Sequence, residues 1–282
     1  MRASESQAEY GVVGGGALSK SLIAGLPAKR RQIGPVVGAS YRVASIMSNR
    51  LRAGHPARAL EELGAVRVIL FHAPSEQVRG MAEMLETADI DWKDKPLIFC
   101  DSEVPVAIMD RFRALGASTA VARQFGIPGT IMLEGAPIAL ACAHRLASQL
   151  KLRAVEIAFG TGFVFAAAHT LATVAITPLI NRVADMLRAS GLRDTDAVRI
   201  AVALFERTIQ DYGHSGKQSW TWHRSEPAAE QIEAEIASVN APFQGLFREL
   251  ILAGFEDFDK HPKVAGELRR AAVRVLAAGE PG

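Results

Sequence analysis

The chain has 282 residues, which is enough for one large domain or two ordinary ones. Hydrophobic residues make up 49% and charged residues 22%, so the composition is that of a globular protein with a full core. The formal net charge is +2 and the basic residues are dispersed, which argues against nucleic-acid binding. Cys100 and Cys142 form neither a disulfide framework nor a zinc-binding spacing, so we expect a cytoplasmic protein.

One stretch raises the question of a membrane span. Residues 160–180 contain no Asp, Glu, Lys or Arg and are long enough to cross a bilayer. The run is rich in Ala and Thr, however, carries His169, and has Pro178 near its end. A helix that is apolar all round is more typical of the buried centre of a domain or dimer. We therefore expect no membrane contact and a homodimer joined through the helical half, which begins here. The polar N-terminus, residues 1–9, lacks the apolar core of a signal peptide.

Strand and helix patterns alternate through the first half of the chain. The strongest strand pattern is the apolar run 66–73, which is typical of a strand buried on both faces of a parallel sheet. This alternation predicts an α/β domain with a doubly wound, mostly parallel sheet. The expected strands are 10–13, 34–40, 66–73, 95–100, 118–122, 130–133 and 153–157, and the expected helices are 17–26, 41–51, 76–86, 104–115 and 137–150.

After residue 160 only helical patterns remain, at 163–190, 194–212, 226–255 and 261–278. Gly191 is expected to end the first of these helices and Asp194 to cap the second. The pattern predicts an α/β domain over residues 1–160 and an all-helical substrate and dimerisation domain over 161–282. The connection 213–227 could be a lid over a site or a plain link; its candidate residues are His214, Lys217, Trp220 and Trp222.

A glycine turn joins the first strand to the first helix, in the pattern Gly14-x-Gly16-x-x-Ser19. The first glycine permits the tight turn, and the second lets the backbone approach a pyrophosphate at the helix N-terminus. The pattern favours a Rossmann-type dinucleotide-binding domain, although a Rossmann fold that has lost its cofactor would look alike. The predicted pyrophosphate-binding residues are Gly14, Gly15, Gly16, Ala17 and Leu18.

The end of the second strand reads Ala39-Ser40-Tyr41-Arg42 and has no acidic residue. An NAD site usually places Asp or Glu here to hold the ribose 2′-hydroxyl. Ser40 and Arg42 could instead bind a 2′-phosphate, which favours NADP over NAD. The alternative is that Arg42 simply begins a solvated helix.

Two further strand ends are expected to face the cofactor, because ligands of open parallel sheets bind beyond the carboxyl ends of the strands. The residues concerned are Ala73, Pro74 and Ser75 after one strand and Asp101 after another. We interpret His72, just before them, as a packed strand residue rather than a catalyst.

Four segments together resemble Rossmann-like oxidoreductases of the 6-phosphogluconate dehydrogenase-like superfamily: VVGGGALSKSL, VILFHAPSEQV, KPLIFCDSEVP and GTGFVFAAAHTLA. The nearest architecture is that of pyrroline-5-carboxylate reductases, with ketopantoate reductases more distant. The resemblance implies that Ala73-Pro74 lines the nicotinamide side. It also implies that the first long helix of the helical domain contributes a polar residue to the active-site cleft.

The chain departs from the family pattern at three places. Ser19 replaces the third glycine or alanine of the turn. The central helix has His169, Thr170 and Thr173 where relatives often carry Asn or Lys, and Arg123-Gln124 stands where the nearest group tends to carry His. These departures affect the expected chemistry more than the fold.

His169 and Thr173 are the candidate catalytic residues, because a spacing of four puts them on one helical face. His169 could donate a proton near neutral pH and Thr173 could orient a carbonyl or a water molecule. His169 could equally be a packed core histidine, and Arg123 could either bind a substrate carboxylate or be an ordinary surface residue. No metal-ligand cluster and no Ser/His/Asp arrangement stands out.

Together these patterns favour an NADP-dependent reductase or dehydrogenase that acts on a small carbonyl or imine substrate. The alternative is a nucleotide-binding homodimer without catalysis, such as a sensor or a structural protein.

Overall fold

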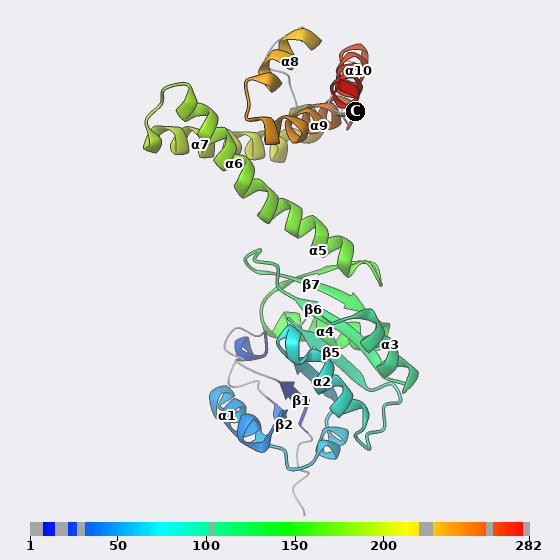
Figure 1. Cartoon of the computed structure of the whole chain (residues 1–282). Helices are drawn as coiled ribbons and strands as arrows, with labels where there is room; N and C mark the ends of the chain where they lie inside the picture. The colour runs from blue at the N-terminus through cyan, green and yellow to red at the C-terminus, as the bar shows by residue number, and fades with distance from the viewer. Residues whose placement is uncertain are drawn as a thin grey trace, which may run out of the picture. The chain divides into compact units, whose positions relative to one another are not determined.

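The computed structural model describes residues 8–14, 22–26, 32–101, 104–219, 228–257 and 262–278, the last seven of these by their backbone alone. Its first half is built on an eight-stranded sheet of order β3-β2-β1-β4-β5-β6-β7-β8 (Figure 1). Neighbouring strands are parallel except β6 and β7, which are antiparallel. This confirms the predicted doubly wound, mostly parallel α/β architecture. The strands are β1 Tyr10–Gly14, β2 Ile33–Gly38, β3 His55–Pro56, β4 Val68–His72, β5 Pro96–Cys100, β6 Ser118–Arg123, β7 Thr130–Gly135 and β8 Arg153–Glu156.

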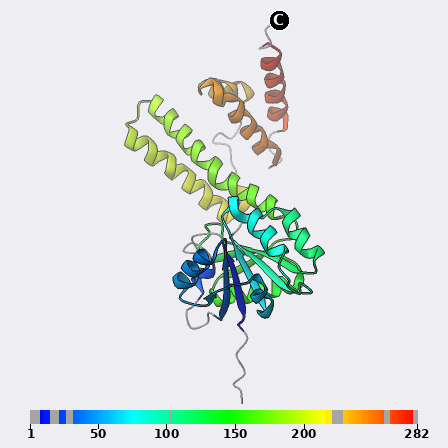
Figure 2. The ribbon, with the colours of Figure 1, turned by 60° about the horizontal axis from the view of Figure 1, so that its bottom comes forward.

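Helices cover both faces of this sheet (Figure 2). Of the predicted helix 17–26 only residues 22–26 are described, and Leu22–Gly25 forms a 3-10 helix rather than an α-helix. The helices and 3-10 turns of this half are η2 Leu22–Gly25, α1 Tyr41–Leu51, η4 Leu60–Ala65, α2 Ser75–Glu86, α3 Val106–Ala114 and α4 Pro137–Gln149.

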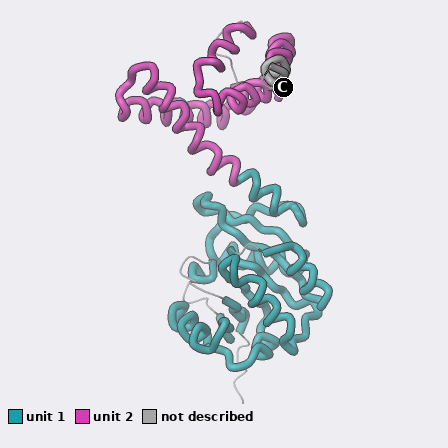
Figure 3. The backbone as a smooth tube through the Cα atoms, in the orientation of Figure 1, with its two compact units in different colours: residues 1–169 teal, residues 170–282 magenta. Residues whose placement is uncertain are grey.

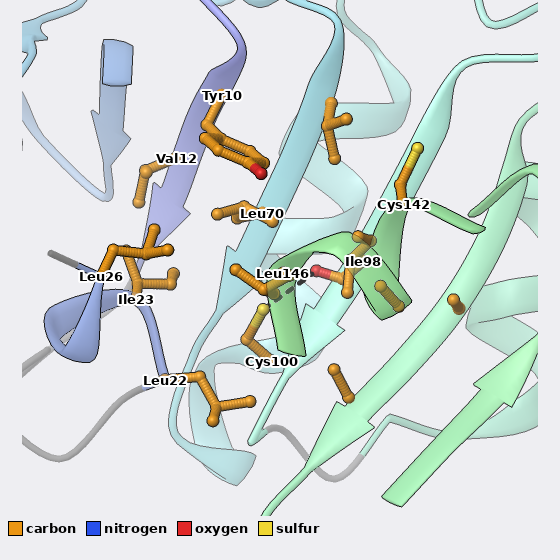
Figure 4. Packing of buried hydrophobic residues seen from close by; sticks show 14 of the residues in the cluster. Tyr10, Val12, Leu22, Ile23, Leu26, Leu70, Ile98, Cys100, Cys142 and Leu146 are labelled. Carbon is orange, nitrogen blue, oxygen red and sulfur yellow. Dashed lines mark hydrogen bonds between the residues drawn. The ribbon is translucent and has the colours of Figure 1, made fainter. Parts of the chain in front are cut away.

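Two apolar cores lie on opposite faces of the sheet, because alternate strand residues point to opposite sides. On one face, residues of β1, β4 and β5 pack against α1 and α4; Figure 4 shows Leu70, Ile98 and Leu146 in this cluster. On the other face, Phe71 and Phe99 pack with α2 and α3. Strands β4 and β5 are buried on both sides, which is why their sequences read as continuous apolar runs.

A long helix follows β8 and runs through α5 Gly162–Thr170, the π-helical segment η5 Leu171–Ala175 and α6 Ile176–Ala189. The predicted helix 163–190 is thereby confirmed, and Gly191, with a φ of 96°, follows it. Pro178 has no N–H to donate to the carbonyl of Val174, which explains a local change of helix type at this place. Among the described residues, this helix is the one that is long and apolar enough to cross a membrane by length and composition.

The chain divides into two compact units, residues 1–169 and 170–282, so the division falls inside the long helix (Figure 3). The predicted domain boundary at residues 160 and 161 precedes this helix. The second unit contains α6 and α7 side by side, with the helices α7 Asp194–Ser215, η6 Gly216–Ser219, α8 Ala229–Ala237, α9 Ala241–Asp257 and α10 Pro262–Ala278 following in order.

Three predictions in the helical half were wrong in detail. The expected helix 226–255 is two helices, α8 and α9, because Pro242 in the first turn of α9 cannot continue an α-helix from α8. Asp194 is the first residue of α7 rather than its cap, and Arg193 holds the cap position. The connection 213–227 begins as helix, since α7 reaches Ser215 and η6 follows; residues 220–227 lie outside the described part.

The contact between β6 and β7 predicts a large cost for a small substitution. A Cβ atom on Gly135 would lie 2.6 Å from both Cα and Cβ of Ala120. We expect Gly135→Ala to lower the free energy of unfolding by about 1–3 kcal/mol through overpacking. Urea unfolding followed by circular dichroism measures this change.

Gly80→Ala is the matched control, because Gly80 lies in α2 with no atom within 4 Å of its added Cβ. This substitution should raise the free energy of unfolding by about 0.5–1 kcal/mol through helix propensity. Equal effects of the two substitutions would contradict the packing at Gly135.

Candidate functional site

The carboxyl ends of β1, β2 and β4 meet at one edge of the sheet. Gly14, the last residue of β1, pairs with Gly38 of β2 and with His72 of β4. A Cβ on Gly14 would overlap the flexible end of the Met47 side chain, which would have to move to make room for it. The remaining predicted pyrophosphate-binding residues, Gly15, Gly16, Ala17 and Leu18, lie outside the described residues, as does Ser19.

The start of α1 carries the predicted 2′-phosphate residues. Ser40 is the N-cap of α1, and its Oγ accepts a hydrogen bond of 3.3 Å from the Val43 N–H. Arg42 is exposed in the first turn, which contains no acidic residue. A helix N-terminus and a guanidinium group at one place favour a bound anion. The residues present therefore fit the phosphate of an NADP molecule at the end of β2.

The exit of β4 is fixed by a histidine. His72 is half-buried, and its Nδ1 donates a hydrogen bond of 2.8 Å to the carbonyl of Cys100 at the end of β5. Ala73 is buried, Pro74 is the N-cap of α2, and Ser75 is exposed at the first position of that helix. These three predicted cofactor residues thus follow directly on the sheet edge that ends in Gly14.

Burial makes the Cys100 thiol unreactive. The residue lies in the apolar core, and burial raises the pKa of its thiol well above the ordinary value. A thiol held neutral in this way is a poor nucleophile. Cys100 is therefore a packing residue at this edge.

Asp101 ties together two segments at the carboxyl edge of the sheet. Its Oδ2 accepts a hydrogen bond of 2.9 Å from the Leu22 N–H, and its Oδ1 accepts one of 3.0 Å from the Gln124 N–H. The residue has a φ of 50°, a left-handed conformation that Asp and Asn adopt more readily than most residues. The carboxylate thus holds the segment after the glycine turn and the end of β6 in place. Direct contact between Asp101 and a cofactor stays a prediction.

His169 is engaged by the turn between β6 and β7. Its Nε2 lies 3.0 Å from the carbonyl oxygen of Phe125 and donates to it, and the two rings are 5.3 Å apart. The ring of Phe125 also packs edge-on against Phe165, with 4.5 Å between centroids. These contacts give His169 a structural role in holding the turn. Thr173 belongs to the second unit, and its place in a site stays a prediction.

The lid candidates are held within the second unit. His214 Nδ1 donates to the carbonyl of Gln210 at 2.7 Å, which is a contact within α7. Lys217 Nζ lies 3.5 Å from the Asp257 carbonyl. Trp220 and Trp222 fall outside the described residues, so the lid hypothesis stays a prediction.

A cavity of about 380 Å³ lies over β6 and β7 in the first unit. The antiparallel register pairs Val121 with Glu134 and Arg123 with Met132, so these four side chains share one face of the sheet. The start of α3 and the start of α5 supply the other walls. The lining is mostly apolar and consists of Val104, Pro105, Val106, Met109, Val121, Arg123, Met132, Glu134, Gly160, Gly162, Phe163 and Ala166.

Glu134 is a buried carboxylate in this cavity, with 6% of its surface exposed. Its Oε1 accepts a hydrogen bond of 2.5 Å from the Gly160 N–H, just before α5. Its Oε2 lies so close to Gly162 that a Cβ on that residue would overlap it. Gly160 therefore donates a hydrogen bond to the Glu134 carboxylate, and the missing side chain of Gly162 leaves space for it.

Sequence reasoning missed Glu134 and treated the run 130–133 only as a strand. The available signal was an acidic residue directly after an apolar strand pattern. Arg123, which sequence reasoning did single out, is half-buried at the same cavity. Its guanidinium carbon lies 5.6 Å from the centroid of the Phe125 ring.

Arg113 supports the wall of the cavity from the end of α3. Its Nε donates to Thr119 Oγ1 at 2.8 Å, and its guanidinium lies over the ring of Phe159 at 4.2 Å. Phe159 directly precedes Gly160, whose N–H is bound by Glu134. The turn from β8 into α5 is thus held from two sides, by a cation–π contact and by a carboxylate.

No family model matches this chain, and no curated protein matches it by sequence. Solved structures do match over nearly the whole chain. An NADP oxidoreductase of Bacteroides fragilis, provisionally so assigned, has a TM-score of 0.68 at 13% identity over 89% of this chain and 98% of its own. An imine reductase from Myxococcus stipitatus in complex with NADP⁺ matches with a TM-score of 0.58 and 14% sequence identity, covering 96% of this chain and 95% of its own. A pyrroline-5-carboxylate reductase from Coxiella burnetii matches with a TM-score of 0.53 and 13% sequence identity, covering 93% of this chain and 98% of its own. At these identities the likeness shows the fold alone, a Rossmann-type α/β domain followed by a helical region.

Asp101→Asn tests the organisation of the sheet edge. Asn keeps the preference for the left-handed backbone, but its side chain offers one acceptor oxygen where the carboxylate offers two. One of the two backbone N–H groups, of Leu22 or Gln124, then loses its partner. We expect the free energy of unfolding to fall by about 1–3 kcal/mol.

The measurement is urea unfolding, together with hydrogen exchange at the amides of residues 22 and 124. At least one of the two amides should exchange faster in the variant than in the natural protein. Unchanged exchange at both sites would contradict the bridging role of Asp101.

Proposed function

We propose that the protein is an NADP-dependent reductase or dehydrogenase that acts on a small carbonyl or imine substrate. The observation that carries the proposal is the convergence at the carboxyl edge of the sheet. There the end of β1 meets the phosphate-compatible start of α1, and the same domain holds a mostly apolar cavity at the start of α5. Ligands of open α/β sheets bind at such an edge.

The choice of NADP is supported by Ser40 and Arg42 at the end of β2, where no acidic residue is present to bind a ribose 2′-hydroxyl. The matching imine reductase was solved with NADP⁺, which agrees with this choice. A bound NADPH supplies a hydride. The chain supplies binding and orientation, and the apolar lining of the cavity excludes water from the substrate.

The roles of the predicted catalytic residues form part of the proposal. Arg123 is suited to bind a substrate carboxylate through its guanidinium fork. His169 would donate a proton and Thr173 would orient the substrate. The Nε2 of His169 is engaged by the Phe125 carbonyl, so proton donation from that nitrogen would compete with this contact.

The same contact favours a second candidate, a nucleotide-binding homodimer without catalysis. A histidine that serves to hold a turn needs no chemistry. The two candidates share the cofactor site at the sheet edge and differ in turnover.

One experiment separates them. NADPH fluorescence is titrated with the protein, and NADPH oxidation is then followed with a panel of small ketones, oxo acids and cyclic imines. A fluorescence change followed by oxidation supports the reductase. Binding without oxidation supports the non-catalytic candidate, and absence of binding overturns both.

Arg42→Ala tests the cofactor preference. If the guanidinium engages the 2′-phosphate, the variant should bind NADP⁺ more weakly by about 1–3 kcal/mol. Binding of NAD⁺ should be unchanged, because NAD⁺ lacks that phosphate. Calorimetric titration of both dinucleotides gives the two affinities. Tighter binding of NAD⁺ than of NADP⁺ by the natural protein would contradict the preference.

We also propose that the protein is a homodimer joined through its helical half. Apolar side chains of the long helix are strongly exposed in the single chain: Phe163 by 67%, Val164 by 70%, Leu171 by 70% and Val174 by 64%. Monomers rarely expose an apolar surface of this extent. A second copy would cover it with an apolar interface of the obligate kind.

Sedimentation in plain buffer tests the dimer. We expect one species near twice 30.2 kDa. Val174→Asp should shift the protein to the monomer, because it buries a charge in the interface. Leu115→Asp, an equal change at an exposed position after α3, should leave the species unchanged. A natural protein that stays monomeric at micromolar concentration refutes the proposal, and a need for detergent points to a membrane instead.

A further inference from the structure

We infer that the cavity over β6 and β7 binds a small apolar ligand through a cationic nitrogen, and that Glu134 is the residue that holds this nitrogen. The inference deepens the proposed function and rests on it for the reaction: of the two substrate classes, it selects the protonated imine over the neutral carbonyl.

Three observations place the carboxyl group of Glu134 in this cavity, with one oxygen available to a ligand. Glu134 lies on the cavity face of β7, opposite Val121 of β6. It is 6% exposed and surrounded by Met109, Met132 and other apolar lining residues. Within the described residues, its side chain has one hydrogen-bond partner, the Gly160 N–H, and no ion pair. Oε1 is occupied by that bond, while Oε2 remains for a ligand.

A carboxylate in apolar surroundings is costly unless a donor or a counter-charge meets it. The N-terminus of α5 meets part of this cost through the Gly160 N–H and the helix dipole. A neutral carbonyl oxygen offers Oε2 nothing, because both groups are acceptors. An N–H of an iminium or ammonium group offers a hydrogen bond and the missing charge together. The cavity therefore favours a nitrogen cation over a carbonyl oxygen at this position.

The position of Arg123 restricts how such a ligand lies. Arg123 is the diagonal neighbour of Glu134 across the strand pair, at a separation of roughly 7–8 Å between such positions. A cationic nitrogen is repelled by Arg123 and attracted by Glu134. Because Oε2 of Glu134 lies beside Gly162, the nitrogen that it binds would lie at that end of the cavity.

This arrangement suits reduction of a C=N bond. A protonated nitrogen withdraws electrons from the imine carbon, so that a hydride adds to the carbon and the π pair returns to nitrogen. The nitrogen keeps its proton throughout, and the product is an amine. Glu134 binds the N–H before and after this step, and the reductant is the dinucleotide of the proposed function.

The test compares piperidine, a cyclic amine protonated at pH 7, with tetrahydropyran, its neutral oxygen analogue. Binding to the full-length protein is measured by NMR titration without any cofactor. We expect piperidine to bind at least about 10-fold more tightly than tetrahydropyran, as for a charge-assisted hydrogen bond. Glu134→Gln should abolish this preference, because the amide carries no charge for piperidine and its NH₂ group can donate to the ether oxygen of tetrahydropyran. Gln retains an oxygen that can accept from the Gly160 N–H, so the fold should be kept.

Glu156→Gln is the matched control. Glu156 lies on β8, the next strand of the sheet, and its Oε2 pairs with His144 at 3.0 Å on the surface. This variant should bind both probes as the natural protein does. Equal affinity of the natural protein for the two probes overturns the inference without need of any variant, as does a Glu134→Gln protein that retains the preference.

The outcomes distinguish failure of the nitrogen site from failure of the proposed function. A natural protein that prefers piperidine but does not bind NADPH overturns the reductase and leaves the nitrogen site standing. A protein that binds NADPH but shows no preference overturns the nitrogen site and leaves the reductase standing.

Discussion

Parallel pairing of β1 with β2 and β4 is the constraint on which the site depends. The register sets Gly14 level with Gly38 and His72, so three chain segments leave the sheet at one edge. The Met47 side chain of α1 packs directly over Gly14, so a methyl group on Gly14 would overlap its end. Asp101 extends the same edge, because its two oxygens bind the amides of Leu22 and Gln124. The glycine that permits the packing of β1 thereby begins the turn that we propose binds a dinucleotide.

Elements buried on both faces were the ones that the sequence predicts well. Residues 68–71 of β4 and all of β5 are apolar because each face meets a core, with Leu70 on one side and Phe71 on the other. A continuous apolar run of this short length, bounded by turn residues, favours a strand of a parallel sheet over a buried helix. The long helix was likewise clear from its lack of charge. The break between α8 and α9 was missed because Asn240-Ala241-Pro242 reads as a tolerable interruption of a continuous apolar period.

The candidate site was predictable only where local chemistry sets it. Ser40 and Arg42 stand at a strand end whose position follows from the pattern, and the structure places them at the start of α1. Glu134 could not be assigned in this way. Its surroundings come from α3 and from the Gly160–Gly162 turn, which are distant in sequence, and from a strand that reverses direction. A single acidic residue at the end of a strand is normally solvated, and only the fold shows that this one is covered.

The surroundings of His169 and Glu134 distinguish two ways in which the reaction could obtain its proton: from a protein side chain, or on a substrate that is already protonated. The Nε2 of His169 is bound to a main-chain carbonyl, and its ring packs against Phe125, so the residue fixes the turn that follows Arg123. Glu134 differs, since one of its oxygens is anchored by the Gly160 N–H and most of the residues that line its cavity are apolar. His169 is not among the residues that line the cavity, and proton transfer from its Nε2 would require the contact with Phe125 to break. A substrate that already carries its proton needs only a negative charge that is held in place. The arrangement of Glu134, Gly160 and Gly162 meets the second requirement without any movement of the turn.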